Sequence, residues 1–495
     1  MPPFDENLRA PDFPADLDWF NARGPLALAD LRGKFVLLDF WTYGCVNCLH
    51  DLAPLAKLAR RFSEELVVVG VHTGKFDRER ESREVRAALL RLGVEHPVVN
   101  DARRELWTAY AIRAWPTLVL IDPAGRMLGA LEGELDADEL APMLERLIHE
   151  RARAGELVYE PLPFVPESAR EPDRVLDHPS KLLVASETTL FVSDTGHHRV
   201  LQLEYEHARK HARIVRVFGG GGDGWHDASG EDARFRSPRG LARRGRTLYV
   251  ADTGNHAVRA IDLELGDVRT IAGTGAKADH RPRVAAPPGE TALRSPWALL
   301  VERPNLYVAM AGSHQVWALE DERVLHRLAG NGREALIDGF APQASFNQPC
   351  DLASDGRQLF VVDAEASAIR AIDLVGRPTV RTLVGRGLRD WGDADGVGEA
   401  VLLQHPMGLA FDGLLHVADS YNHKLKRLDP TTREVRTLAG TGERGHEDGS
   451  VGSARFANPE GVAVRNHLVF VADTDNHALR VVDVRRLTVD TIELG

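Results

Sequence analysis

Two cysteines three positions apart are the residues whose spacing most directly indicates chemistry in this chain. Cys45 and Cys48 follow a strand-like run, residues 34–41, and precede a helix-like stretch. A Cys-x-x-Cys pair that opens a helix can cycle between dithiol and disulfide, and the first sulfur lies where backbone N–H groups and the helix dipole favour negative charge. Because the thiolate is the attacking species, this placement predicts that Cys45 is a nucleophile.

A zinc site is the alternative interpretation of this pair. Structural zinc normally has four ligands, and the third cysteine, Cys350, lies about 300 positions further along the chain. We therefore expect no metal at the pair, and no cofactor other than a redox-active disulfide between Cys45 and Cys48. Cys350 is expected to be a small buried residue.

The composition limits the partners and the compartment. The chain has 495 residues, a net charge of −12 and 43% hydrophobic residues, which predicts a globular protein of two or three domains. The net negative charge lacks the basic bias that binding to a phosphate backbone needs, so we expect no nucleic-acid partner. We expect a cytoplasmic protein without membrane contact, because no secretory signal opens the sequence, no apolar run reaches the length of a membrane span, and three cysteines are too few for a disulfide framework.

The first 155 residues alternate strand-like and helix-like segments. Expected strands lie at 34–41, 66–71, 96–100, 118–122 and 127–131. Expected helices follow the cysteines and lie at 82–92, 103–112 and 138–151. Strands separated by helices and followed by a hairpin predict an α/β sheet.

This region resembles the thioredoxin superfamily over about its first 150 positions. Asp39 lies six residues before Cys45, where thioredoxins keep a buried acid, and Trp41 matches the tryptophan of their Phe-Trp-Ala run. The segment Trp115–Pro116–Thr117 looks like their cis-proline segment. Four such features in the right order are far more specific than the cysteine pair alone.

The resemblance implies a role for each of these residues. Cys45 would attack a substrate disulfide, Cys48 would resolve the mixed disulfide, and Asp39 would accept the proton of Cys48. Trp41, Trp115, Pro116 and Thr117 would contact the substrate, with Pro116 in cis exposing backbone groups of Trp115. Two simpler interpretations stay open. Asp39 could be a buried acid without a kinetic role, and Trp41 could be a core residue without a substrate contact.

The residues around the cysteines depart from the thioredoxin pattern. Gly44 replaces the usual tryptophan, and Val46–Asn47 replaces Gly-Pro. Because the intervening dipeptide strongly affects thiol chemistry, the sequence assigns neither a reducing nor an oxidising direction. A peroxiredoxin pattern is only half met, since Thr42 lies three before Cys45 but Leu38 occupies the proline position.

Beyond a proline-rich segment, residues 156–175, which we expect to be an extended linker, the chain repeats itself. The phrase from Leu248 to His256 is one of six similar copies with a period of 53–58 residues, and a proline precedes each copy. Four short strands fit into each period, which predicts a six-bladed β-propeller over residues 176–495. The anchor positions of the copies are Asp194, Asp252, Met310, Asp363, Asp419 and Asp473.

These copies resemble NHL repeats, and a thioredoxin-like domain followed by an NHL propeller resembles the NHL-repeat-containing protein two family. The repeat histidines are expected to make hydrogen bonds within their own blades, for example to the anchor aspartate four positions earlier, rather than to bind metal. They are His198, His256, His314, His423 and His477. The basic residues seven positions past the anchor are expected on blade surfaces; they are Arg259, Arg370, Lys426 and Arg480.

The sequence therefore predicts a multidomain protein, an α/β thioredoxin-like fold (residues 1–155) followed by an all-β NHL propeller. We expect a cytosolic thiol–disulfide oxidoreductase whose propeller docks a protein disulfide or thiol substrate. An interaction scaffold with a redox-sensing or vestigial first domain is the alternative, and a metal-binding propeller enzyme is a third.

Overall fold

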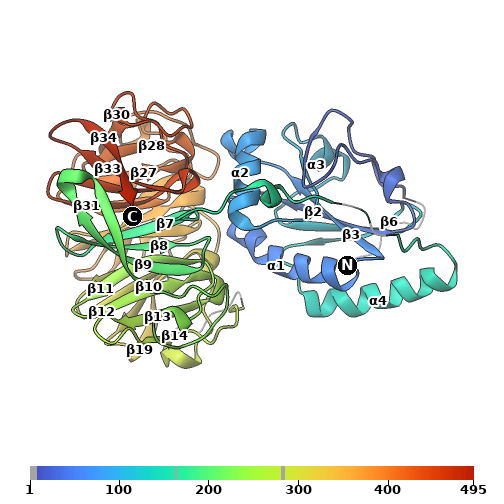
Figure 1. Ribbon diagram of the computed structural model, residues 1–495, viewed down its shortest axis with the longest axis horizontal. Coiled ribbons are helices and arrows are strands. Elements are labelled where there is room, and N and C mark those ends of the chain that lie inside the picture. The colour runs from blue at the N-terminus through green and yellow to red at the C-terminus, as the bar shows by residue number, and fades with distance from the viewer. Residues whose placement is uncertain (1–7, 161, 163, 280–284) are drawn as a thin grey trace. The chain divides into compact units, whose positions relative to one another are not determined.

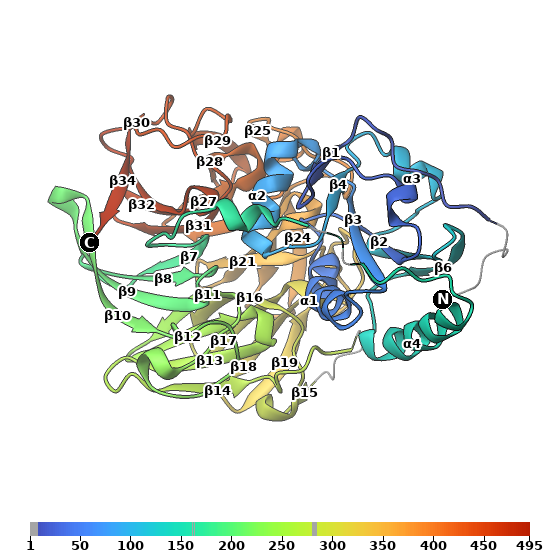
Figure 2. The ribbon, with the colours of Figure 1, turned by 45° about the vertical axis from the view of Figure 1, so that its right-hand side comes forward.

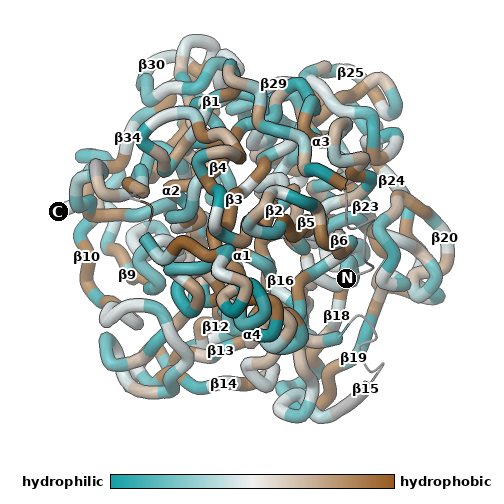
Figure 3. Tube along the Cα trace, turned by 90° about the vertical axis from the view of Figure 1, so that its right-hand side faces the viewer, coloured by the Kyte–Doolittle hydropathy of each residue, from teal (hydrophilic) through white to brown (hydrophobic). Residues whose placement is uncertain are grey.

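The computed structural model describes residues 8–160, 162, 164–279 and 285–495, and it divides into two compact units, Met1–Asp173 and Arg174–Gly495 (Figure 1). Figure 3 shows hydrophobic stretches along the strands and hydrophilic ones in many loops. Among the helices described here, none has both the length and the apolar character needed to cross a membrane.

The first unit is a six-stranded mixed sheet with helices, in the strand order β1-β4-β3-β2-β5-β6. The strands are β1 (Asp18–Phe20), β2 (Phe35–Trp41), β3 (Leu66–His72), β4 (Val98–Asn100), β5 (Thr117–Ile121) and β6 (Met127–Glu132). The helices are α1 (Val46–Arg61), α2 (Ser82–Leu92), α3 (Glu105–Ala109) and α4 (Ala137–Arg153), with short 3-10 turns η1 (Leu28–Leu31), η2 (Arg78–Arg80) and η3 (Glu167–Arg170). The α/β prediction is confirmed, although α3 is shorter than expected and the three-residue β1 was not predicted.

Strand β2 lies at the centre of this sheet and is buried along its whole length. It pairs in parallel with β3 and antiparallel with β5. Its side chains alternate between two cores: Val36, Leu38 and Phe40 face one cluster, whereas Phe35 and Leu37 face the other. Burial on both faces explains why this segment reads as a continuous apolar run.

The segment expected to be a linker, residues 156–175, differs from that expectation over most of its length. The Val158 amide donates to the Gly33 carbonyl at 2.9 Å, and the Lys34 ammonium donates to the Val158 carbonyl at 2.7 Å. Further on, Arg86 of α2 pairs with Glu167 and Glu171 at 2.8 and 3.0 Å. Residues up to 173 therefore belong to the first unit, because they supply it with backbone and ionic partners.

The second unit is a ring of six four-stranded antiparallel blades within its described residues, and Figure 2 shows it from β7 to β34. Blades one to three are β7 (Pro179–Val184), β8 (Thr189–Asp194), β9 (Arg199–Glu206), β10 (His211–Phe218); β11 (Pro238–Arg244), β12 (Thr247–Asp252), β13 (Ala257–Asp262), β14 (Val268–Ala272); and β16 (Pro296–Glu302), β17 (Asn305–Met310), β18 (Gln315–Glu320), β19 (Val324–Ala329). Blades four to six are β21 (Pro349–Ser354), β22 (Gln358–Asp363), β23 (Ala368–Asp373), β24 (Thr379–Val384); β26 (Gly408–Phe411), β27 (Leu415–Asp419), β28 (Lys424–Leu428), β29 (Glu434–Ala439); and β31 (Pro459–Arg465), β32 (Leu468–Asp473), β33 (Ala478–Asp483), β34 (Thr488–Leu494).

Short elements complete the blades. Two-residue strands pair with outer strands of blades three to six: β15 (Ala285–Ala286), β20 (Gly339–Phe340), β25 (Gly396–Val397) and β30 (Gly449–Ser450). The remaining 3-10 turns are η4 (His207–Arg209), η5 (Gly230–Asp232), η6 (Thr253–Asn255), η7 (Pro288–Glu290), η8 (Ala311–Ser313), η9 (Ala364–Ala366), η10 (Gly398–Ala400), η11 (Ser420–Asn422) and η12 (Thr474–Asn476).

The repeat histidines hold neighbouring blades together, which corrects the expectation that they bond within their own blade. His256 Nδ1, for example, accepts from the Ser295 amide of the next blade at 3.1 Å, and Thr253 Oγ1 donates to the Pro296 carbonyl at 2.6 Å. The same histidine bond links blades one to two, three to four, five to six and six to one. Each histidine ends its turn at a positive φ of 51–56°, which aims the ring at the neighbouring blade.

The basic residues seven positions past the anchor are not on blade surfaces, and this prediction is wrong. Arg259, Arg370, Lys426 and Arg480 are fully buried. Arg259 and Arg480 each place one guanidinium nitrogen 2.8 Å from the anchor carboxylate of their own blade. A buried cation requires a paired anion, so the aspartate and the basic residue form one structural unit inside the blade.

Candidate functional site

The turn between β2 and α1 places Cys45 at the N-cap of the helix, directly before its first residue, Val46. Its backbone is extended (φ −84°, ψ 112°), and its carbonyl accepts the first helical hydrogen bond, from the Leu49 amide at 3.1 Å. Cys45 is half-buried, whereas Cys48, one turn further on, is 1% exposed. The more accessible sulfur therefore lies at the helix N-terminus, where the dipole favours a thiolate.

Both cysteines of the pair are free thiols, and they interact with each other. Burial raises the pKa of the Cys48 thiol well above its usual value, and a hydrogen bond with Cys45 raises it further. The charge of Asp39 acts in the same direction. A buried thiol with a raised pKa needs a proton acceptor within the core before it can attack.

Asp39 is a fully buried carboxylic acid in the middle of β2. Neither of its oxygens has a hydrogen-bond partner among the described residues. Burial raises its pKa well above 3.8, and the charge of Asp51 on α1 adds to this effect. A carboxyl group in this environment gains a proton more readily than an ordinary aspartate does.

The predicted cis-proline segment adjoins the end of β2. The Trp115–Pro116 peptide bond is cis, as expected. Thr117 opens β5 and pairs with Phe40 of β2, so the register brings the cis-proline segment beside the strand from which the cysteine turn departs. The Thr117 hydroxyl donates to the Ala114 carbonyl at 2.8 Å and is turned inward.

Trp41 is a core residue, which corrects its assignment as a substrate contact. Its side chain is fully buried, and its ring meets His72 edge-on with centroids 5.3 Å apart. Trp115 is partly exposed and packs on Trp107 at 4.6 Å, with the Arg104 guanidinium 5.4 Å from its ring centroid. Trp115 and Trp107 are thus partly exposed, whereas Trp41 is not.

Two buried residues that the sequence did not single out hold the cysteine turn. Glu79 accepts from the Gly44 amide at 3.1 Å and from the Lys75 and Phe76 amides at 2.6 and 3.1 Å. His72 stacks on Tyr43 with centroids 5.2 Å apart, and burial lowers its pKa to about 3. Glu79 lies in a charge-rich run that resembles a solvated surface, so no local pattern distinguishes it.

The axis of the propeller is filled by side chains from the innermost strands. The residues directly after the blade prolines are all buried: Ser180, Arg239, Trp297, Cys350, Met407 and Glu460. Cys350 is accordingly a buried residue, as expected.

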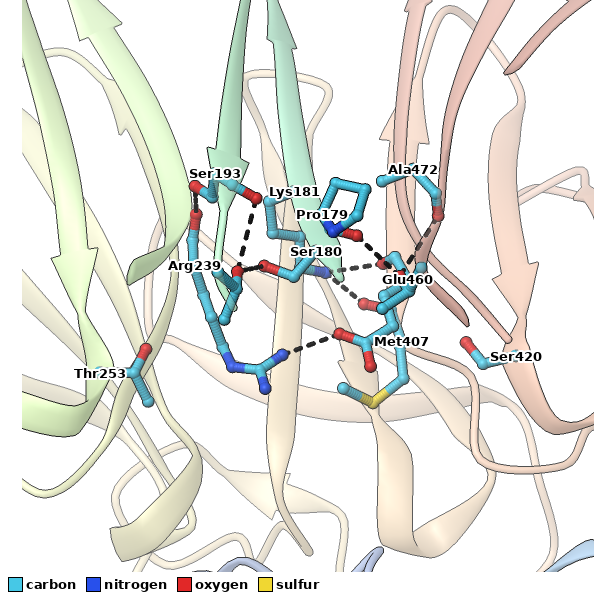
Figure 4. A network of polar contacts seen from close by, with 12 residues as sticks. Pro179, Ser180, Lys181, Ser193, Arg239, Thr253, Met407, Ser420, Glu460 and Ala472 are labelled. Atoms are coloured by element: carbon cyan, nitrogen blue, oxygen red, sulfur yellow. Dashed lines mark hydrogen bonds and ion pairs between the residues drawn. The ribbon is translucent and has the colours of Figure 1, made fainter. Parts of the chain in front are cut away.

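Two ion pairs cross between the blades at this axis. Arg239 donates to Glu460 at 2.7 Å and lies 4.1 Å from the Trp297 ring centroid. Lys181 Nζ donates to Asp351 Oδ2 at 2.8 Å and to the Glu460 carbonyl at 3.1 Å. Figure 4 shows Lys181 and Arg239 reaching toward Glu460. The four charged side chains at the axis therefore pair with one another: Arg239 with Glu460, and Lys181 with Asp351.

Comparison with known proteins agrees with both folds. A family model described as Thioredoxin-like matches residues 33–127, and one described as NHL repeat matches residues 456–482. The chain is 39% identical to Protein SUPPRESSOR OF QUENCHING 1, chloroplastic, of Arabidopsis thaliana, over 96% of this chain but 47% of the plant protein. It is 38% identical to NHL repeat-containing protein 2 of Gallus gallus, over 97% of this chain and 71% of that protein. A stretch of 127 residues, 25% of this chain, is 32% identical to Thiol-disulfide oxidoreductase ResA of Bacillus subtilis (strain 168) and covers 63% of ResA.

Proposed function

This chain belongs to the NHL repeat-containing protein 2 family, and we propose that its thioredoxin-like domain is a thiol–disulfide oxidoreductase. The observation that carries the proposal is the asymmetry of the two thiols. Cys45 is partly accessible at a helix N-terminus, whereas Cys48 is buried and the charge of the buried Asp39 raises its pKa. The likeness to ResA, which is named as an oxidoreductase of this class, supports the same activity.

The reaction proceeds in two exchanges. The Cys45 thiolate attacks one sulfur of a substrate disulfide, forms a mixed disulfide and releases the first substrate thiolate, which takes a proton from solvent. Cys48 then loses its proton to Asp39 and attacks the Cys45 sulfur, which releases the second substrate sulfur as a thiolate. This thiolate takes a proton from solvent, and Asp39 returns its own proton to solvent. The substrate gains two electrons, and the protein is left with a Cys45–Cys48 disulfide. A thiol reductant restores the dithiol, and with an oxidised protein and a dithiol substrate the same steps run in reverse.

The propeller would present the substrate, which we propose to be a protein. Extended substrate backbone would lie along the cis-proline segment, with Trp115 as its aromatic neighbour. A cytoplasmic location remains part of the proposal, and the plant relative is named as chloroplastic.

The test is an insulin reduction assay with the full-length chain and dithiothreitol. Cys45→Ser and Cys45→Ser/Cys48→Ser should reduce the rate to that of the reductant alone, whereas Cys350→Ala should keep it because Cys350 lies in the propeller core. Cys48→Ser should accumulate the mixed disulfide, which mass spectrometry detects. Equal rates for the wild type and the double variant would refute the proposal and favour a scaffold with an inert first domain.

A further inference from the structure

The seam between the sixth and first blades differs in chemistry from the other blade seams. The residue before each blade proline donates its amide to the repeat residue of the preceding blade, and here that residue is His178, preceded by Asp177. The matching residue pairs at the other seams are Arg236–Ser237, Arg294–Ser295, Asn347–Gln348, Gln404–His405 and Ala457–Asn458. Only the six-to-one seam therefore combines a carboxylate with an imidazole opposite a repeat histidine, His477.

These three side chains converge. Asp177 Oδ1 lies 2.8 Å from His178 Nδ1 and 3.3 Å from His477 Nδ1, and one ligand atom from each residue lies within 4.8 Å of the others. The imidazole centroids are 4.2 Å apart. The Asp177 amide donates to Asp194 at 2.6 Å, which fixes the backbone that presents the cluster.

The position of His178 suits an ion. Its side chain is 7% exposed, and its Nδ1 faces Asp177 Oδ1 at 2.8 Å in a contact that lacks good hydrogen-bond geometry. A cation between this buried nitrogen and the carboxylate would accept an electron pair from both. Asp177 is 34% exposed, so a small ion can reach the cluster from solvent.

We propose that Asp177, His178 and His477 bind a zinc ion that links the first blade to the last. Two imidazoles and one carboxylate are an established zinc donor set, with water in the fourth position. Coordination by His477 Nδ1 replaces the 3.2 Å hydrogen bond that it accepts from the His178 amide. The ion joins residues 299 positions apart and so ties the two ends of the ring. Because it binds only the closed ring, it stabilises the propeller by mass action.

A second cluster joins the same two blades and provides an internal comparison. His207, His467 and Asp483 also bring their ligand atoms within 4.8 Å, but His207 is exposed and its Nδ1 lies 3.2 Å from the Tyr205 hydroxyl. Asp483 accepts from two backbone amides. These groups already have partners, so this cluster is the weaker candidate and the main competitor to exclude.

The experiment uses the full-length chain with Cys45→Ser and Cys48→Ser, so that the thiol pair contributes no zinc binding. Calorimetric titration with Zn²⁺ should give one site per chain, and Co²⁺ should give the visible absorption of a four-coordinate centre. Asp177→Asn and His178→Ala should each weaken zinc binding by more than the roughly 10–100-fold of an outer-shell change. Zinc should raise the melting temperature of the propeller only where the cluster is intact.

Two control variants separate the alternatives. His256→Gln removes the equivalent histidine of the blade two-to-three seam, and His467→Gln removes a ligand of the second cluster; both should keep zinc binding. Asp177→Asn preserves size and fold, so a folded variant is available if His178→Ala is unstable. Absence of binding, binding that survives Asp177→Asn, or binding lost in His467→Gln would each overturn the proposal.

Discussion

The ion pair between Lys181 and Asp351 gives the sharpest test of the physical reasoning about the propeller. Lys181 belongs to blade one and Asp351 to blade four, so the pair spans the axis of a six-bladed ring. Both side chains are almost buried, at 6% and 13% exposure. Burial raises the pKa of Asp351 although Lys181 opposes this effect, which indicates that desolvation outweighs the pairing.

Lys181→Met should be strongly destabilising because it leaves the Asp351 carboxylate buried without its cation. Removal of one partner of a buried pair costs about 3–5 kcal/mol. For a unit of 322 residues (174–495), an unfolding entropy of about 2.1 cal/mol/K per residue gives about 0.7 kcal/mol per degree, hence a fall of about 4–7 °C in melting temperature. The Asp351→Asn variant should lower the melting temperature less, since the Lys181 ammonium still donates to the Met407 and Glu460 carbonyls.

The double variant Lys181→Met/Asp351→Asn closes the cycle. Because no unpaired charge remains, its destabilisation should be smaller than the sum of the two single effects by about 2–3 kcal/mol. Differential scanning calorimetry of the full-length chain measures all four proteins, and Arg213→Ala, which breaks an exposed pair with Glu204, is the control that should change little. Additive effects to within about 0.5 kcal/mol would show that Lys181 and Asp351 are not coupled and that their ion pair does not stabilise the axis.

Two further predictions concern the thiol site. Burial raises the folded-state pKa of Asp39, so the folded state loses stability as pH rises from about 3.9, the pKa in the unfolded state, through the higher folded value. The Asp39→Asn variant should therefore be more stable than wild type at alkaline pH in thermal scans, and it should slow the Cys48 step in single-turnover reduction. Unchanged kinetics would leave Asp39 a purely structural acid. Glu79→Gln keeps one acceptor oxygen for three amides and should destabilise the first unit by about 2–4 kcal/mol while slowing insulin reduction; an unchanged melting temperature and rate would contradict its role in holding the cysteine turn.

Local patterns in the sequence determined the parts that depend on neighbours along the chain. The apolar run of β2 predicts the sheet, and the period of the repeated phrases predicts the ring. Both signals come from residues that are close together in the sequence. The position of Cys45 at the start of α1 follows from the same local signals. The likeness to thioredoxins added the cis bond before Pro116, which the structure contains.

Only the tertiary structure decided the contacts between distant segments. The sequence left Trp41 open as a substrate contact or a core residue, and the structure buries its side chain completely, with its ring against His72 of β3. Glu79 becomes a buried anchor because the loop after β3 folds back on the cysteine turn. The repeat histidines accept hydrogen bonds from the next blade, and Asp177 lies beside His477, 300 positions away in the sequence. Closure of the ring brings these residues together, and no local sequence pattern reveals such contacts.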